Sequence, residues 1–146
     1  MTFAAKYVMS ALPNIEPVSL MVMLFGAVFG LKGLYPTYLY VLMEILFFGI
    51  GTWNVNYLYI WALPVLAAHI LRNMEEPLGW ALVSGSFGLF FGALCAPVDA
   101  VIGGGSYAVA KWISGIPFDI AHCAGNFVIT LVMFNPMRKL MKKLYK

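Results

Sequence analysis

The sequence predicts an all-α integral membrane protein, built as a six-helix transmembrane bundle. Of its 146 residues, 62% are hydrophobic and 10% are charged, whereas about 25% of the residues of a soluble domain are charged. The apolar residues fall into runs separated by short turns, and most Lys and Arg residues lie in those turns or in the C-terminal tail. Because a spanning helix needs about 20 residues, we expect residues 1–146 to form a single transmembrane domain with no soluble domain.

The first apolar stretch, residues 1–12, is interrupted by Lys6. A helix of this length reaches about 18 Å, whereas the hydrocarbon core of a bilayer is about 30 Å thick. We therefore expect a truncated first helix, and the interruption also makes the stretch a poor signal peptide. Prolines on both sides of Asn14 and Glu16 then end this helix in a turn at a membrane surface.

The second and third helices are expected at Val18–Leu31 and Thr37–Gly51. Gly26 and Gly30 have the Gly-x-x-x-Gly spacing of closely packed helices, a signal that is also common by chance. Glu44 lies near the middle of the third helix. A carboxyl group at that depth is either part of a functional site or a protonated side chain bonded to a neighbouring backbone.

The fourth helix is expected at Leu58–Leu71, with a kink at Pro64. Residues 49–57 before it predict a polar and aromatic loop. Two Trp, two Tyr and two Asn lie between Trp53 and Trp61. Such a cluster is either an aromatic belt at the membrane interface or one wall of a binding site.

The fifth helix, Leu78–Pro97, has small residues on one face, a pattern that lets helices approach closely. They are Gly85, Gly88 and Gly92. Residues 99–105 contain three consecutive glycines and predict a flexible loop, which a short helix at 106–114 with Lys111 and Trp112 follows. The glycines do not form a phosphate-binding loop, because no Gly-Lys-Ser or Gly-Lys-Thr follows them.

The sixth helix is expected at Pro117–Phe134, ended by Asn135 and Pro136. Pro117 fits the first turn of a helix, where a missing N–H costs nothing. All the polar side chains of this segment share one stripe of the helical wheel: Asp119, His122, Cys123, Asn126 and Thr130. Because an Asp near the centre of a spanning helix costs about 2.5–3.5 kcal/mol, the stripe is either an interhelical hydrogen-bond seam or one wall of a solute site.

The distribution of Lys and Arg predicts the orientation. With six spans and a cytoplasmic C-terminus, Lys32, Arg72 and the five cations of the tail lie inside, and only Lys6 and Lys111 lie outside. The basic balance therefore reflects topology and indicates no nucleic-acid partner. Polar and aromatic residues converge on the outer side: Asn14, Glu16, Trp53, Asn54, Asn56, Tyr57, Asp99, Trp112 and Asp119. This asymmetry predicts a pocket that opens to the outside.

The chain lacks the usual signatures of catalysis and of metal binding. We interpret Cys95 and Cys123 as small packing residues, since their spacing fits no metal site. No Ser or Cys nucleophile signature, zinc-protease motif or Walker motif is present, so we expect neither a metal nor a cofactor. Two alternatives remain: an intramembrane enzyme that uses Asp119 and His122 as acid and base, and a ligand-free scaffold held by its glycine stripes.

Five segments form a distinctive combination that covers nearly the whole chain. They are Ala11–Val18, the Phe-Gly-x-x-Phe-Gly of Phe25–Gly30, the Trp-x-x-Asn-Tyr-x-Tyr of Trp53–Tyr59, Phe91–Cys95, and Gly115–Asn126. In this combination the chain resembles a substrate-specific (S) component of an energy-coupling factor (ECF) transporter. The resemblance does not identify the solute.

The resemblance implies a six-helix protein of a prokaryotic cell membrane, with both ends in the cytoplasm and a high-affinity site near the outer surface. It implies a transmembrane T component and two ATPase subunits as partners, and toppling within the membrane to carry the solute inward. Members of the family dock on the T component through Ala-x-x-x-Ala on the first helix. Ala4, Ala5 and Ala11 do not have that spacing.

The resemblance, together with the polar and aromatic residues of the outer side, leads us to expect capture of a small vitamin-like or heterocyclic solute for ATP-driven uptake. Aromatic faces would sandwich a flat ring; the residues are Trp53, Tyr57, Trp61 and Trp112. Polar groups would bond its edge; the residues are Asn14, Glu16, Asn56, Lys111, Asp119, His122 and Asn126. Because the acidic residues outnumber Lys111, we expect a neutral or cationic heterocycle, such as a thiamine-, pyridine- or purine-like compound.

Overall fold

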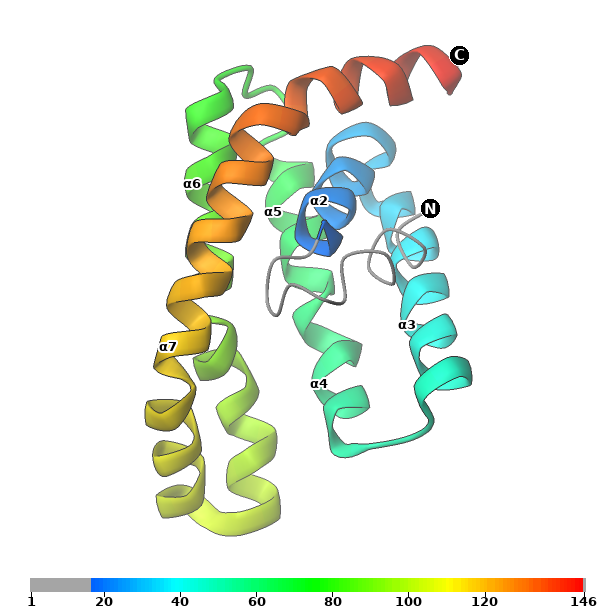
Figure 1. The fold of residues 1–146 in the computed structure, drawn as a ribbon. Helices are drawn as coiled ribbons and strands as arrows, with labels where there is room; N and C mark the ends of the chain where they lie inside the picture. Colours follow the sequence, from blue (N-terminus) through cyan, green and yellow to red (C-terminus); the bar gives the residue numbers. More distant parts are fainter. Residues whose placement is uncertain (1–16, 146) are drawn as a thin grey trace.

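The computed structural model describes residues 17–145, and every regular element within them is helical (Figure 1). The elements are α2 (Val18–Phe29), the 3₁₀ helix η1 (Gly30–Gly33), α3 (Leu34–Phe48), α4 (Thr52–Ile60), α5 (Ala62–Ile70), α6 (Pro77–Leu89) and α7 (Phe91–Leu144). The all-α prediction is thus confirmed. Two helical segments, Val18–Phe48 and Pro77–Leu144, are long and apolar enough to cross a membrane. The count of six stays a prediction, since residues 1–12 lie outside the described part.

The short helix α2 lies at the centre of the bundle, in contact with α3, α5, α6 and α7. Every residue from Val18 to Ala27 is buried, as expected for a helix that is apolar on all sides. Gly26 allows the closest approach, because a Cβ added there would lie 2.4 Å from the carbonyl oxygen of Val65 on α5. The Gly-x-x-x-Gly spacing is therefore used within the chain.

The third predicted helix is α3, but it begins earlier than expected, at Leu34. Pro36 lies in its first turn, where proline is tolerated. The helix ends at Phe48, before the predicted Gly51, and the next residue, Gly49, has a φ of 83°, in the left-handed region that favours glycine. Glu44 is buried on this helix.

The polar loop predicted at residues 49–57 is confirmed only for residues 49–51 and is wrong from Thr52 onward, because Thr52 to Tyr57 form the start of α4. Asn54 explains the difference: its side-chain oxygen accepts the N–H of Gly51 at 2.5 Å, which caps the first turn. The predicted kink is confirmed. The helix is interrupted at Trp61 between α4 and α5, because Pro64 has no N–H to donate to the turn before it.

The fifth helix and the loop after it also differ from the prediction. The helix breaks at Phe90, and α7 starts at Phe91. The short helix expected at residues 106–114 is present as part of α7. Residues 99–103 and Gly105 are helical rather than a loop, and the chain reverses at one residue, Gly104, with φ 82° and ψ 170°. Only glycine adopts this conformation readily. The result is a helical hairpin within α7, at the bottom of Figure 1.

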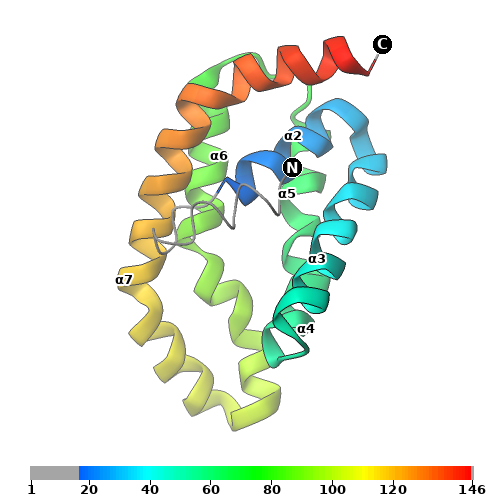
Figure 2. The same cartoon turned by 45° about the vertical axis from the view of Figure 1, so that its right-hand side comes forward.

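The boundaries predicted for the sixth helix are wrong at both ends. Pro117 does not open a helix but lies inside α7, and Asn135 and Pro136 do not end it, since α7 continues to Leu144. Beyond Pro136, Met137 and Met141 pack against the same core cluster around α2 that Phe134 joins before it. Figures 1 and 2 both show this last part of α7, coloured orange to red, turned across the end of the bundle.

The close-packing face predicted on the fifth helix is confirmed at Gly85 and Gly88. A Cβ added to Gly88 would lie 2.8 Å from the backbone carbon of His122 on α7, and one added to Gly85 would lie 3.4 Å from the Cys123 carbonyl oxygen. The two backbones are thus almost in contact, and α6 and α7 pair along their length.

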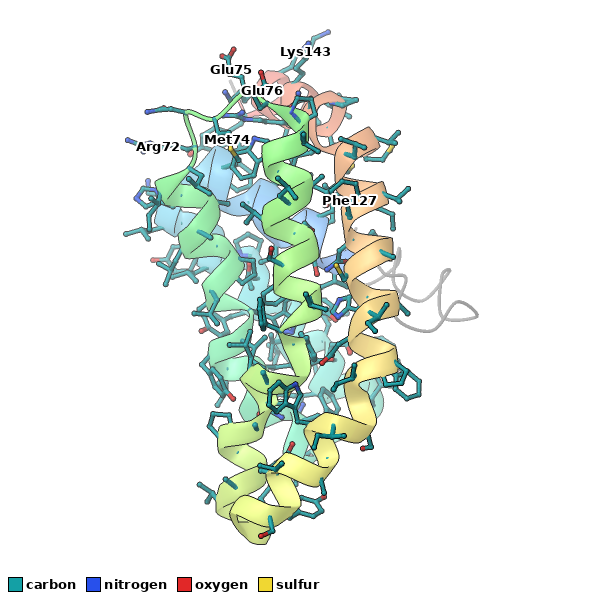
Figure 3. All side chains as sticks on the ribbon, turned by 90° about the vertical axis from the view of Figure 1, so that its left-hand side faces the viewer. Arg72, Met74, Glu75, Glu76, Phe127 and Lys143 are labelled. Carbon is teal, nitrogen blue, oxygen red and sulfur yellow. The ribbon has the colours of Figure 1, made fainter. Side chains whose placement is uncertain are left out.

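The two ends of the bundle differ in charge. We call one the basic end: it contains η1 with Lys32, the α5–α6 connection, and the last part of α7 with Lys139, Lys142 and Lys143. In Figure 3 the labelled Arg72, Glu76 and Lys143 lie together at this end. We call the other the Gly104 end, formed by the Gly104 reversal and the α3–α4 connection, both at the bottom of Figure 1.

Candidate binding pocket

A pocket of about 370 Å³ lies toward the Gly104 end, between α4 and the helical hairpin of α7. Its size falls in the range of small-molecule sites, about 300–1,000 Å³. One wall comes from α4, and two come from the arms of the hairpin before and after Gly104. The lining residues are Trp53, Asn56, Gly92, Cys95, Asp99, Lys111, Trp112, Ser114, Gly115 and Phe118. We call it the Trp53–Trp112 pocket.

Aromatic rings line this pocket, and further rings in contact with them extend from it toward the core. The ring of Trp53 meets the edge of Tyr57 at 5.1 Å between centroids, and Tyr57 meets Trp61 at 5.5 Å. Trp61 is 3% exposed and packs on Phe91, which in turn contacts His122 at 5.2 Å. Because each ring supports the next, the orientation of Trp53 is fixed from the core outward.

An ion pair joins the two arms of the hairpin across the pocket. Lys111 Nζ donates to Asp99 Oδ1 at 2.5 Å. The aspartate side chain is 6% exposed, whereas the lysine side chain is 49% exposed. Asp99 is therefore held in the pocket wall, whereas Lys111 is more exposed to solvent. The positive charge of Lys111 is balanced by the Asp99 carboxylate.

Asp119 is a structural neighbour of the pocket wall. Both of its carboxylate oxygens accept the N–H of Gly92, at 3.1 and 3.2 Å. Gly92 lies in the first turn of α7, where N–H groups have no partner within the helix. A Cβ at Gly92 would lie 2.5 Å from Asp119 Oδ2 and 3.2 Å from Trp112 Cδ1. The absence of a side chain at Gly92 therefore allows both Asp119 and Trp112 to pack against the first turn of α7.

The α4 wall is tied to the hairpin through Tyr59. Its hydroxyl donates to the carbonyl oxygen of Leu94 at 2.5 Å and lies 3.2 Å from the side-chain oxygen of Asn56. Asn56 is buried and also lines the pocket. This link fixes the distance between the two walls.

The inner half of the polar stripe on α7 forms a hydrogen-bond seam. Asn126 is 2% exposed and donates to Ser19 Oγ on α2 at 3.1 Å and to the Ser84 carbonyl on α6 at 3.2 Å. Thr130 donates to Ser84 Oγ at 2.9 Å. The seam alternative therefore has a structural counterpart in Asn126 and Thr130. No residue of the stripe lines the pocket, which is reached instead by Gly115 and Phe118, just before the stripe.

The structure brings some of the predicted site residues together and separates others. Those that line the pocket are Trp53, Asn56, Lys111 and Trp112. Those that pack behind it are Tyr57, Trp61, Asp119 and His122. Asn126 lies in the seam, and Asn14 and Glu16 lie outside the described residues. Glu44 is buried on α3 and does not line this pocket. The binding roles of all these residues stay predictions.

The expected binding residues omit six lining residues: Gly92, Cys95, Asp99, Ser114, Gly115 and Phe118. Of these, only Asp99 is among the polar groups expected to converge on the outer side. Gly92, Cys95 and Asp99 are three and four residues apart, which is the spacing of one helix face. The shared helix face of these three residues cannot be recognised when residues 99–105 are interpreted as a loop. Cys95, interpreted as a packing residue, is a half-buried free thiol in the pocket wall.

Within residues 17–145, no three His, Cys, Asp or Glu side chains are placed so that they could hold a metal ion. Asp119 is engaged with Gly92, and His122 contacts the rings of Phe87 and Phe91. What the pocket offers is therefore aromatic surface with a few polar groups.

Comparison with known proteins gives no relative: no family model matches the chain, and no curated protein or solved structure matches it either.

Proposed function

We propose that this chain is the solute-binding membrane subunit of an ECF-type importer, which captures a small vitamin-like or heterocyclic solute from the outside. The observation that carries the proposal is the Trp53–Trp112 pocket, which lies toward the end opposite most of the cations. Small-molecule sites are typically concave and lined by aromatic surface with a few convergent polar groups. The segments on which the resemblance rests supply Trp53, Gly92 and Gly115 to this pocket.

The outer surface supports the membrane placement. Large apolar side chains are exposed along α3, α6 and α7, among them Leu39, Leu46, Leu82, Ile120, Val128 and Val132. Soluble proteins rarely expose such continuous apolar surface. Among the described residues, every exposed charged side chain except Lys111 lies at the basic end. By the positive-inside rule, this end faces the cytoplasm, so the chain crosses a prokaryotic cell membrane several times with its C-terminus inside.

The chemistry of the pocket supports a flat solute without net negative charge. Trp53, Trp112 and Phe118 offer ring faces and edges for stacking. Asp99 already balances the charge of Lys111 at 2.5 Å. The pocket therefore offers no unpaired cation to an anionic solute. A neutral or cationic heterocycle therefore fits best.

The partners in this proposal come from the resemblance: a transmembrane T component and two ATPase subunits that hydrolyse ATP while this chain binds the solute. No specific observation favours either alternative, the intramembrane enzyme or the ligand-free scaffold. Among the described contacts, Asp119 accepts the N–H of Gly92 and His122 packs against Phe91, so no contact favours their use as acid and base. The glycine stripes that a scaffold would use for assembly pack against helices of the same chain.

The proposal is tested by native mass spectrometry and calorimetry of the purified protein with a panel of vitamin-like heterocycles. We expect one compound to bind, and Trp112→Ala to weaken it by about tenfold or more, since loss of one stacked ring costs about 0.5–1.5 kcal/mol beyond the lost area. Tyr35→Ala is the matched control, because Tyr35 is an aromatic residue with 78% exposure that lies outside the pocket. Equal losses in both variants, or no binding by any compound, would count against a solute-binding role.

A further inference from the structure

A second pocket, of about 270 Å³, lies at the basic end and plays no part in the function proposed above. It is lined by the α5–α6 connection and the last part of α7: Glu75, Asn135, Arg138, Lys139 and Lys142. We propose that this pocket binds the headgroup of an anionic phospholipid. The proposal rests on the membrane placement of the proposed function, but not on solute transport.

Arg138 gives this pocket a fixed cation. Its side chain is largely buried, with 9% exposure, and its guanidinium lies 5.7 Å from the ring of Trp80. Nη1 donates to the Met74 carbonyl at 2.8 Å, and Nη2 donates to the Arg72 carbonyl. The buried Nε–H has no hydrogen-bond acceptor within the described part of the chain. The guanidinium is therefore held in place in the pocket lining, and Nη1 and Nη2 each carry a second N–H besides the one that bonds a carbonyl. A fixed guanidinium of this kind is suited to a phosphate group.

The charges around the pocket favour an anion that also carries hydroxyl groups. Arg138, Lys139 and Lys142 bring three cations, against the one carboxylate of Glu75. Asn135 Nδ2 donates to the Glu75 backbone carbonyl at 3.1 Å, which fixes the connection against α7. The lysines can reach the phosphate oxygens, and the Glu75 carboxylate can accept hydroxyl donors. Phosphatidylglycerol has both features.

The position of this pocket favours a lipid over a soluble phosphate. The last part of α7 lies across the end of the bundle (Figures 1 and 2), anchored by Met137 and Met141 in the core. Leu140 and Leu144 are exposed on the same short segment as the pocket lysines. Exposed apolar and basic residues on one helix are typical of a helix that lies in the membrane interface, where anionic headgroups and acyl chains are both within reach.

The test compares two double variants that remove the same charge. Lys139→Gln/Lys142→Gln empties the pocket of its lysines, whereas Lys32→Gln/Lys143→Gln removes two exposed lysines of the same end that do not line it. Binding of phosphatidylglycerol and phosphatidylcholine to the detergent-purified full chain is titrated by native mass spectrometry. We expect phosphatidylglycerol to bind preferentially, and its binding to weaken by about tenfold or more in the pocket variant only.

Three outcomes would overturn this proposal. Equal weakening in the two double variants would show general charge attraction without a site. Equal binding of both lipids would show no headgroup selection. Displacement of the lipid by an equal concentration of soluble glycerophosphate would show a site for a free phosphate compound. Solute binding is measured on the same samples, so that failure of the lipid proposal can be distinguished from failure of the solute-binding proposal. Because the lipid pocket is separate from the Trp53–Trp112 pocket, we expect both double variants to keep an unchanged solute affinity.

Discussion

At the scale of single residues, Gly92 shows how the Trp53–Trp112 pocket depends on close contacts. Its N–H is accepted by both carboxylate oxygens of Asp119, and its missing side chain leaves space for Asp119 and Trp112. Asp119 was expected to bond the solute. In the structure its carboxylate instead occupies the first turn of α7, where negative charge is favourable, and so it holds the wall in which Trp112 stands.

Asn126 allows the two interpretations of the polar stripe to be separated. Asn126→Ala removes hydrogen bonds to Ser19 and Ser84 inside the bundle, so we expect the free energy of unfolding to fall by about 1–3 kcal/mol. Because Asn126 does not line the pocket, the solute affinity of the folded protein should not change. Thermal unfolding and calorimetry measure the two quantities. Asn73→Ala, at an exposed position, is the control. A large loss of affinity without a loss of stability would place Asn126 in the site.

At the scale of elements, the pairing of α6 with α7 depends on how closely two backbones approach. Gly88 faces the backbone of His122, and Gly85, one helical turn before Gly88, faces Cys123. The sequence pattern indicated a packing face but not its partner. The structure shows that the partner is the second arm of the α7 hairpin, which becomes a neighbour only because Gly104 reverses the chain.

Gly88→Ala and Gly85→Ala form a matched pair that tests this contact. A Cβ at Gly88 would lie 2.8 Å from a backbone carbon that no rotamer change can move, whereas at Gly85 it would make an ordinary contact at 3.4 Å. We expect Gly88→Ala to lower the free energy of unfolding by about 1–3 kcal/mol, and Gly85→Ala to have a much smaller effect. The midpoint of thermal unfolding in detergent reports both. Similar midpoints for the two variants would contradict the close approach.

At the scale of the whole molecule, the separation of charge between the two ends connects the two proposals. The basic end holds the pocket that we assign to a lipid headgroup, and the Trp53–Trp112 pocket lies toward the Gly104 end. The cations of the basic end come from three separate segments, and only the fold brings them together. If the basic end lies in the cytoplasm, the solute pocket is available from the outside.

Labelling with a membrane-impermeant maleimide tests this orientation. In a Cys95→Ala/Cys123→Ala background, Ser106→Cys places a thiol at the exposed Gly104 end and Lys143→Cys places one at the exposed basic end. We expect intact cells to label the first at once and the second only after permeabilisation, because the cations stay inside. The opposite pattern would contradict the orientation, and labelling of both in intact cells would contradict a membrane-spanning bundle.

The sequence by itself determined the helical class, the apolar surface, the kink before Pro64 and the packing face of Gly85 and Gly88. These follow from composition and local spacing, which act within a few residues. It also indicated Trp53, Asn56, Lys111 and Trp112, since polar and aromatic groups stand out in apolar segments. Only the tertiary structure decided that the glycine-rich segment is a reversal at one residue rather than a loop, and that Pro117 and Pro136 lie inside a helix. Packing overrides these local breaking signals, because neighbouring helices stabilise turns that an isolated segment would not form. The same packing placed Asp119 on Gly92 and Asn126 in a seam, contacts between residues far apart in the chain that no local pattern contains.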